Sequence, residues 1–217
     1  MMKLEPFSVA VFDMDGTLLN SMHIWDQLID AYLLEQGMQP WPELRDAIRA
    51  LDMRDTAAYL QAHGVSGEID AIMDGINALA EREYAAKASL KPGVKAYLAQ
   101  LRAQGVAMAA ATATDRVVAE PVLRRMGLLP FFRALLTCTE EGVDKQTPEI
   151  YLRAARAAGG NPPQGCAVFE DALHCIQSAK AAGFYTVAVQ DASAAYAWEE
   201  ICRTADAHIA SYEELLY

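Results

Sequence analysis

Short apolar segments alternate with helical patterns along much of the chain, and this alternation constrains the fold more than any other feature. Apolar residues in the stretches between the expected strands recur at three- and four-residue spacing, which is typical of amphipathic helices. An order of strand, helix, strand, repeated in this way, predicts a doubly wound α/β fold with a parallel sheet covered by helices on both faces. The expected strands are 9–12, 105–112, 134–138, 166–170, 185–189 and 207–210, and the expected helices are about 92–104, 116–127, 147–158, 172–182 and 196–204.

Residues 18–89 break this alternation. They hold amphipathic stretches such as HIWDQLIDAYLLEQG and EIDAIMDGINALAEREYAAKA, and no convincing strand. We therefore expect a small helical domain inserted after the first strand, with residues 1–17 and 90–217 forming the α/β core. The return to the core is expected at LKPG, where Pro92 suits the first turn of a helix.

Composition narrows the classes of partner. The chain has 217 residues, of which 53% are hydrophobic, and 29 acidic against 18 basic residues give a net charge of −11. This acidity disfavours binding to nucleic acid or to an anionic membrane surface. No apolar run approaches the roughly 18 residues of a membrane span, so we expect a cytoplasmic protein. The four cysteines have no CxxC spacing, and we expect neither a disulfide nor a zinc site.

Two aspartates follow the first expected strand, in the stretch VAVFDMDGTLLN. Asp13 and Asp15 are two residues apart, so their carboxylates can lean toward the same side of an extended chain. Two such charges about 6 Å apart repel by roughly 3 kcal/mol at an effective dielectric near 20. A positive group should therefore lie beside them, and Gly16 would allow the backbone to approach a ligand closely. The plain alternative is a polar turn that leads into the next helix.

The other strand ends also carry polar side chains. The second strand ends at Thr112, where hydroxyl and backbone N–H groups are able to hold an anion; Lys145 follows the third strand, and Glu170 and Asp171 end the fourth. Each has an ordinary alternative, as a helix cap, a solvated lysine or first-turn acids. Because ligands of such sheets bind beyond the carboxyl ends of the strands, the four ends together indicate a site.

These motifs resemble those of a known family. FDMDGT, Thr112, Lys145 and FEDALHCIQSAKAAG are similar, in order and in strand context, to motifs one to four of the haloacid dehalogenase-like hydrolases. The helical insert resembles the cap of the β-phosphoglucomutase-like branch. The chain departs from the usual pattern at Asn20, at Gln146 and at Cys175, where the family has Asp, Pro and Gly.

The resemblance implies a reaction through a phosphorylated aspartate. Asp13 would be the nucleophile, and Asp15 would be the acid that protonates the leaving oxygen and then the base that activates water. Lys145 would neutralise charge shared by Asp13 and the phosphoryl group. Thr112 and the backbone N–H of Ala113 would bind that group.

The resemblance also implies a magnesium site. The ligands would be a carboxylate oxygen of Asp13, the backbone carbonyl of Asp15 and the carboxylate of Asp171, with Glu170 as a further ligand or a partner of these ligands. Hard oxygen ligands of this kind are what Mg²⁺ prefers.

The type of reaction is indicated by two positions. Asp15 favours phosphate esters, because dehalogenases and phosphonate-cleaving relatives lack this second aspartate. Mutases of the family carry a histidine ten residues after it, where this chain has Trp25. We therefore expect a phosphatase, with a phosphosugar mutase as one alternative and a catalytically weak protein that senses a phosphorylated metabolite as another.

The substrate is expected to be a small phosphorylated metabolite, bound by a monomer or a homodimer. Arg54 is a candidate for contact with a distal group of that substrate, and Trp25 for an apolar wall of its pocket. The ordinary alternatives are a solvated residue at a helix start for Arg54 and a place in the cap core for Trp25. His174, beside the acids of the fourth motif, is expected at the surface, with an approach to the metal site as the alternative.

Overall fold

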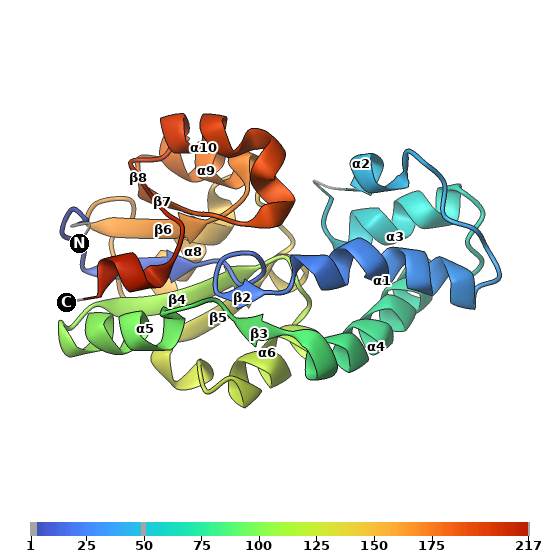
Figure 1. Cartoon of the computed structure of the whole chain (residues 1–217), viewed down its shortest axis with the longest axis horizontal. Coiled ribbons are helices and arrows are strands. Elements are labelled where there is room, and N and C mark those ends of the chain that lie inside the picture. The colour runs from blue at the N-terminus through green and yellow to red at the C-terminus, as the bar shows by residue number, and fades with distance from the viewer. Residues whose placement is uncertain (1–3, 49–50, 217) are drawn as a thin grey trace.

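The computed structural model describes residues 4–48 and 51–216. Its centre is a six-stranded sheet in which every neighbouring pair is parallel, in the order β5-β4-β1-β6-β7-β8 (Figure 1). The predicted strands are confirmed, with small shifts at their ends. The strands are β1 Val9–Phe12, β4 Ala107–Thr112, β5 Ala134–Thr137, β6 Cys166–Glu170, β7 Tyr185–Val189 and β8 Ala207–Ile209.

Both faces of the sheet are covered, which confirms the doubly wound fold. Along β1, Ala10 and Phe12 pack into one hydrophobic cluster with helices α5 (Val94–Ala103) and α6 (Arg116–Arg125), whereas Val9 and Val11 pack into a second cluster with α8 (Glu149–Ala157) and α9 (Leu173–Ala181). This two-sided burial explains why the strand is apolar at every position. The helices are α5 Val94–Ala103, α6 Arg116–Arg125, α7 Cys138–Glu141, α8 Glu149–Ala157, α9 Leu173–Ala181 and α10 Trp198–Thr204, with short 3₁₀ turns η1 Leu129–Phe131, η2 Ala192–Ala197 and η3 Tyr212–Leu215.

The inserted segment is helical and lies beyond one end of the sheet (Figure 1). It contains α1 Met22–Glu35, α2 Leu44–Ile48, α3 Met53–Ala62 and α4 Ile69–Lys87. The two connections to the sheet pair as antiparallel strands, β2 Leu19–Asn20 and β3 Ser89–Leu90, which the sequence did not predict because two residues show no periodicity. We call this pair the hinge strands and the four helices the cap.

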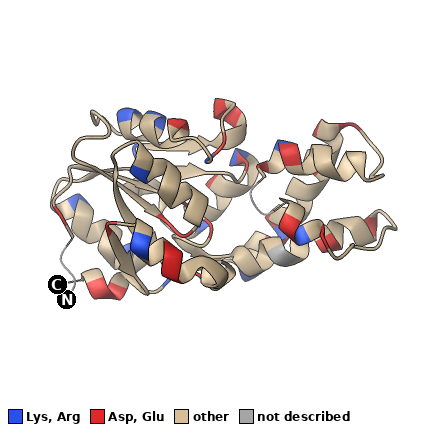
Figure 2. Cartoon of the chain, turned by 90° about the horizontal axis from the view of Figure 1, so that it is seen from above, with Lys and Arg blue, Asp and Glu red and all other residues tan. Residues whose placement is uncertain are grey.

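Two smaller differences concern the return to the core and the surface. Pro92 precedes the N-cap of α5, Gly93, and so lies outside the first helical turn in which it was predicted. Figure 2 shows acidic and basic positions interspersed over both the sheet region and the cap. Within the described ranges, no helix is both long and apolar enough to cross a membrane. All four cysteines are free thiols, and three of them are buried.

Candidate active site

Three carboxylates meet where β1 and β6 end. Asp13 continues the pairing of the two strands, since its N–H donates to the carbonyl of Phe169 over 3.0 Å. β6 ends at Glu170, and Asp171 follows it. Oxygen atoms of Asp13, Glu170 and Asp171 lie within 4.8 Å of one another, and all three residues are buried. Adjacent parallel strands therefore bring together acids that are far apart in the sequence, as the strand-end pattern predicted.

A buried lysine lies between two of these acids. Lys145, in the loop between α7 and α8, donates from Nζ to Oδ1 of Asp13 and, over 2.7 Å, to Oε1 of Glu170. Its side chain is only 9% exposed, so the alternative of a solvated surface lysine is wrong. Tyr151 of α8 adds a second donor to Glu170, with a hydroxyl distance of 2.8 Å. Sequence reasoning missed Tyr151, which carries no motif.

Charge in this cluster is not balanced. Burial and the nearby Glu170 raise the pKa of Asp13 to about 7, although Lys145 opposes the shift. Burial, Glu170 and Asp13 also hold the pKa of Asp171 well above its usual range. Burial alone would lower the pKa of Lys145, but the two acids outweigh it and raise that pKa well above normal. One lysine for three carboxylates leaves room for a further cation, and the all-oxygen donor set fits Mg²⁺.

Gly16 allows Asp171 to come close to the chain that carries Asp13. Its φ is +81°, and a Cβ at this position would lie 2.4 Å from Oδ2 of Asp171. The neighbouring Thr17 donates from Oγ1 to Oδ1 of Asp171 over 3.3 Å. The predicted close approach at this glycine is therefore made by a site carboxylate of the protein.

Asp15 faces a different set of partners. Its Oδ1 accepts hydrogen bonds from the hydroxyls of Ser21, at 2.6 Å, and Tyr84, at 2.5 Å, and its Oδ2 accepts one from Thr114 at 2.6 Å. Ser21 follows hinge strand β2, and Tyr84 lies in the last turns of α4, just before hinge strand β3. Both connections to the cap thus touch this carboxylate. No sequence signal pointed to Ser21 or Tyr84.

The remaining predicted residues divide into two groups. Thr112 ends β4, the strand that pairs with β1 ahead of Asp13, is buried, and accepts the N–H of Thr114 at its Oγ1 over 3.0 Å. Ala113 follows it and is half-buried. In contrast, Arg54 is exposed on α3, where its guanidinium donates to Asp70 of α4 over 2.7 Å. Trp25 is half-buried and meets the ring of Tyr84 edge-on at 6.1 Å.

His174 and a second lysine complete the surroundings. His174 is half-buried rather than fully at the surface, and burial lowers its pKa. Its Nε2 lies 3.3 Å from Sγ of Cys175. Lys91, next to hinge strand β3, forms a buried ion pair with Asp191 over 2.9 Å. This pair lies near Asp171, whose pKa Asp191 raises and Lys91 lowers.

Comparison with known proteins decides the family. The model of the haloacid dehalogenase-like hydrolases matches residues 7–183. The chain belongs to this family. The family predicted from the four motifs is therefore confirmed. A structure named putative beta-phosphoglucomutase, from Thermotoga maritima, shares the fold at 24% identity, with a TM-score of 0.71 over 96% of each chain.

Relatives of this hydrolase include phosphatases. It is 33% identical over 189 residues to phosphoglycolate phosphatase of Pseudomonas putida, covering 82% of this chain and 68% of that one. It is 27% identical over 199 residues to the fructose-1-phosphate phosphatase YqaB of Escherichia coli, covering 86% and 98%. Among solved structures, CbbY of Rhodobacter sphaeroides in complex with phosphate has a TM-score of 0.84 at 22% identity, covering 96% of each chain.

Proposed function

We propose that this hydrolase is a magnesium-dependent phosphatase that removes the phosphoryl group of a small metabolite through an aspartyl-phosphate. The observation that carries the proposal is the buried cluster of Asp13, Glu170 and Asp171 with a single lysine, Lys145. A phosphatase site needs a nucleophile, an acid and cations that tolerate a dianionic substrate. The relatives named as phosphatases support the same class of substrate.

Asp13 forms the bond to phosphorus, and Asp15 transfers the protons. A carboxylate oxygen of Asp13 attacks phosphorus, the bond from phosphorus to the leaving oxygen breaks, and Asp15 protonates that oxygen. Asp15 then takes a proton from the water that attacks phosphorus, and the second displacement restores the carboxylate of Asp13. Proton transfer requires Asp15 to turn from the hydroxyls of Ser21 and Tyr84 toward the substrate.

Cations hold the phosphoryl group and the acids together. Lys145 keeps its proton and offsets charge on Asp13 while the phosphoryl group binds. Mg²⁺ would supply the further positive charge that these acids lack. It would be held by Asp13, Asp171 and the backbone carbonyl of Asp15. Glu170 would either bind the ion directly or contact its other ligands. Thr112 and the N–H of Ala113 bind phosphoryl oxygens. Gly16, which has no side chain, leaves room for the carboxylate of Asp171 beside the proposed metal.

Trp25, which stands where mutases of the family carry a histidine, favours hydrolysis over phosphosugar mutation. The side chain packs against Tyr84 and offers no titrating group. A mutase must also return the phosphoryl group to the sugar, whereas a phosphatase only has to admit water.

Phosphate release tests the proposal directly. We expect the chain to release phosphate from p-nitrophenyl phosphate and from fructose 1-phosphate when Mg²⁺ is present, and not after its removal with a chelator. Asp13→Asn should abolish release, while Asp30→Asn, which removes a half-buried carboxylate of α1 that pairs with Arg45, should not. No release from any ester, or full activity of Asp13→Asn with folding confirmed by circular dichroism, would contradict it. Isomerisation of β-glucose 1-phosphate in a parallel assay would show the mutase, and tight binding without turnover would show the regulator.

A further inference from the structure

A hollow of about 280 Å³ lies between α4 of the cap and the α/β core, where β5 and the loop after β4 end. Its core side includes Thr137, which pairs in register with Thr112 across β4 and β5, and Asp115, which follows Thr114. Its cap side is the α4 face that carries Asp74 and Asn77. The volume is slightly below the range of about 300–1,000 Å³ that is usual for ligand pockets, which suits a small metabolite.

One wall of the hollow carries an acceptor that has no donor. Nδ2 of Asn77 donates to Oδ2 of Asp115 over 2.7 Å, and the other oxygen of Asp115 accepts the hydroxyl of Thr139 at 2.5 Å. A carboxylate only accepts hydrogen bonds, so Asp115 fixes which end of the Asn77 amide faces it. Asn77 is only 7% exposed, and its Oδ1 is left buried with no hydrogen-bond partner among the described residues. A hydroxyl of a ligand inserted between α4 and the strand ends would supply the missing donor.

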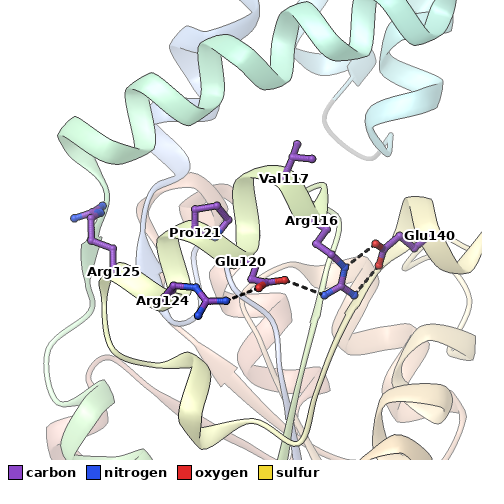
Figure 3. Close-up of a pocket in the computed structure, with 7 residues that line it drawn as sticks. All are labelled: Arg116, Val117, Glu120, Pro121, Arg124, Arg125 and Glu140. Atoms are coloured by element: carbon purple, nitrogen blue, oxygen red, sulfur yellow. Dashed lines mark hydrogen bonds and ion pairs between the residues drawn. The ribbon is translucent and has the colours of Figure 1, made fainter.

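Negative charge dominates the same hollow. The cation among its described lining residues, Arg116, is held by Glu140 through two hydrogen bonds of 2.6 and 2.7 Å and by the carbonyl of Leu135 at 2.7 Å. Figure 3 shows this guanidinium turned to Glu140 and Glu120. Arg116 therefore has little charge left to offer to an anionic ligand.

Two of the carboxylates have no such compensation. Asp70 is paired with Arg54, but within the described part of the chain Asp74 and Asp115 form no ion pair. A carboxylate or second phosphate on the substrate would enter this field against like charge, whereas hydroxyl groups would find acceptors.

We propose that this hollow receives the leaving group of the substrate and selects neutral, hydroxyl-rich leaving groups over those that carry an anion. The proposal rests on the phosphatase activity proposed above and names its substrate class, a phosphate monoester of a sugar or polyol. Asn77 and Asp115 would be its specificity-determining residues, with Asp74 contributing charge at the rim.

Specificity constants for two natural esters test the selection. Fructose 1-phosphate has a neutral polyhydroxyl leaving group, and 2-phosphoglycolate has a carboxylate; p-nitrophenyl phosphate reports the chemistry itself. We expect kcat/KM to favour fructose 1-phosphate over 2-phosphoglycolate by at least about tenfold in the wild-type protein. Asp115→Asn and, separately, Asp74→Asn should each move that ratio several-fold toward 2-phosphoglycolate, mainly through KM.

The controls keep the test decisive. Asp74 is exposed, so Asp74→Asn gives an answer even if Asp115→Asn does not fold. Glu81→Gln removes the same charge from an exposed position of α4 outside the hollow and should leave the ratio unchanged. Two results would overturn this inference alone, provided that p-nitrophenyl phosphate is turned over. One is a preference for 2-phosphoglycolate over fructose 1-phosphate. The other is a ratio of the two kcat/KM values that neither aspartate variant changes. Absence of phosphate release from all three esters would overturn it together with the proposed function.

Discussion

The hydroxyl of Tyr84 donates a hydrogen bond to Oδ1 of Asp15, so a residue of the cap holds the proposed acid and base of the core. Burial, and then the charge of Asp15, raise the pKa of Tyr84 well above its usual value, which keeps the hydroxyl protonated and a donor. Ser21, on the other connection to the cap, donates to the same oxygen over 2.6 Å. Movement of the cap about the hinge strands would therefore change the partners of this carboxylate and its orientation.

Tyr84→Phe tests whether this contact positions Asp15 for proton transfer. A hydrogen bond to a charged group contributes about 1.5–3 kcal/mol, so we expect kcat for an alkyl phosphate to fall by about tenfold or more with little change in KM. p-Nitrophenyl phosphate should lose less, because its leaving group departs without a proton. Tyr32→Phe, at another buried cap tyrosine, is the matched control and should retain its rates. Equal losses for both esters would show a structural role only.

The main parts of the fold and of the acid cluster were predictable because parallel strands align their carboxyl ends. Asp13 and Asp171 each follow an apolar strand, and the order of strands in the sheet brings them together. Tyr84 does not follow a strand, so its position in the sequence does not indicate that it contacts Asp15, which is 69 residues away. The Lys91 and Asp191 pair was missed for the same reason, since only the packed structure buries both groups together. Arg54 was predicted as a substrate contact, but the structure pairs it with Asp70, and no sequence motif indicates this ion pair.

Gly16→Ala should move the side chain of Asp171 far more than it moves the backbone at residue 16. The new methyl group would lie 2.4 Å from Oδ2 of Asp171, so that carboxylate must move away from Asp13. We expect Mg²⁺ affinity, measured by calorimetry, to fall by at least about tenfold, since Asp171 is a proposed ligand and a displaced ligand loses its geometry. Gly37→Ala is the matched control, because Gly37 has a similar φ of +74° and no atom of the described residues lies within 4 Å of an added Cβ.

The control separates two causes. Both variants place a side chain in the left-handed region, which costs about 1 kcal/mol of stability, and a small drop in melting temperature is expected for each. A change in Mg²⁺ affinity in Gly16→Ala alone identifies the contact with Asp171. If the two variants bind Mg²⁺ equally well, Gly16 does not govern the position of that carboxylate.

Lys145→Met should destabilise the metal-free protein strongly. Removing one partner of a buried ion pair leaves uncompensated charge and costs about 3–5 kcal/mol, and here Glu170 loses its counter-ion while Asp13 loses its hydrogen-bond donor. Lys180→Met removes a lysine from the more exposed pair with Asp206, which should cost less than about 1 kcal/mol. Chemical denaturation measures both values. A cost for Lys145→Met as small as that for Lys180→Met would show that the buried pair does not offset the acids.

Mg²⁺ affinity should depend on pH through Asp13. Its pKa of about 7 lies far above the usual 3.8, so the folded metal-free protein holds a proton on Asp13 that the unfolded chain releases. Folding is then favoured at low pH, and the stability of the metal-free protein should fall as pH rises from about 4 through 7. Mg²⁺ must displace this proton, so its affinity should rise by about tenfold per pH unit below 7, or more steeply because the pKa of Asp171 is raised as well. Calorimetric titrations in buffers of different ionisation enthalpy would count the protons released. A dissociation constant that stays the same between about pH 5 and pH 8 would contradict a protonated Asp13 in the metal-free site.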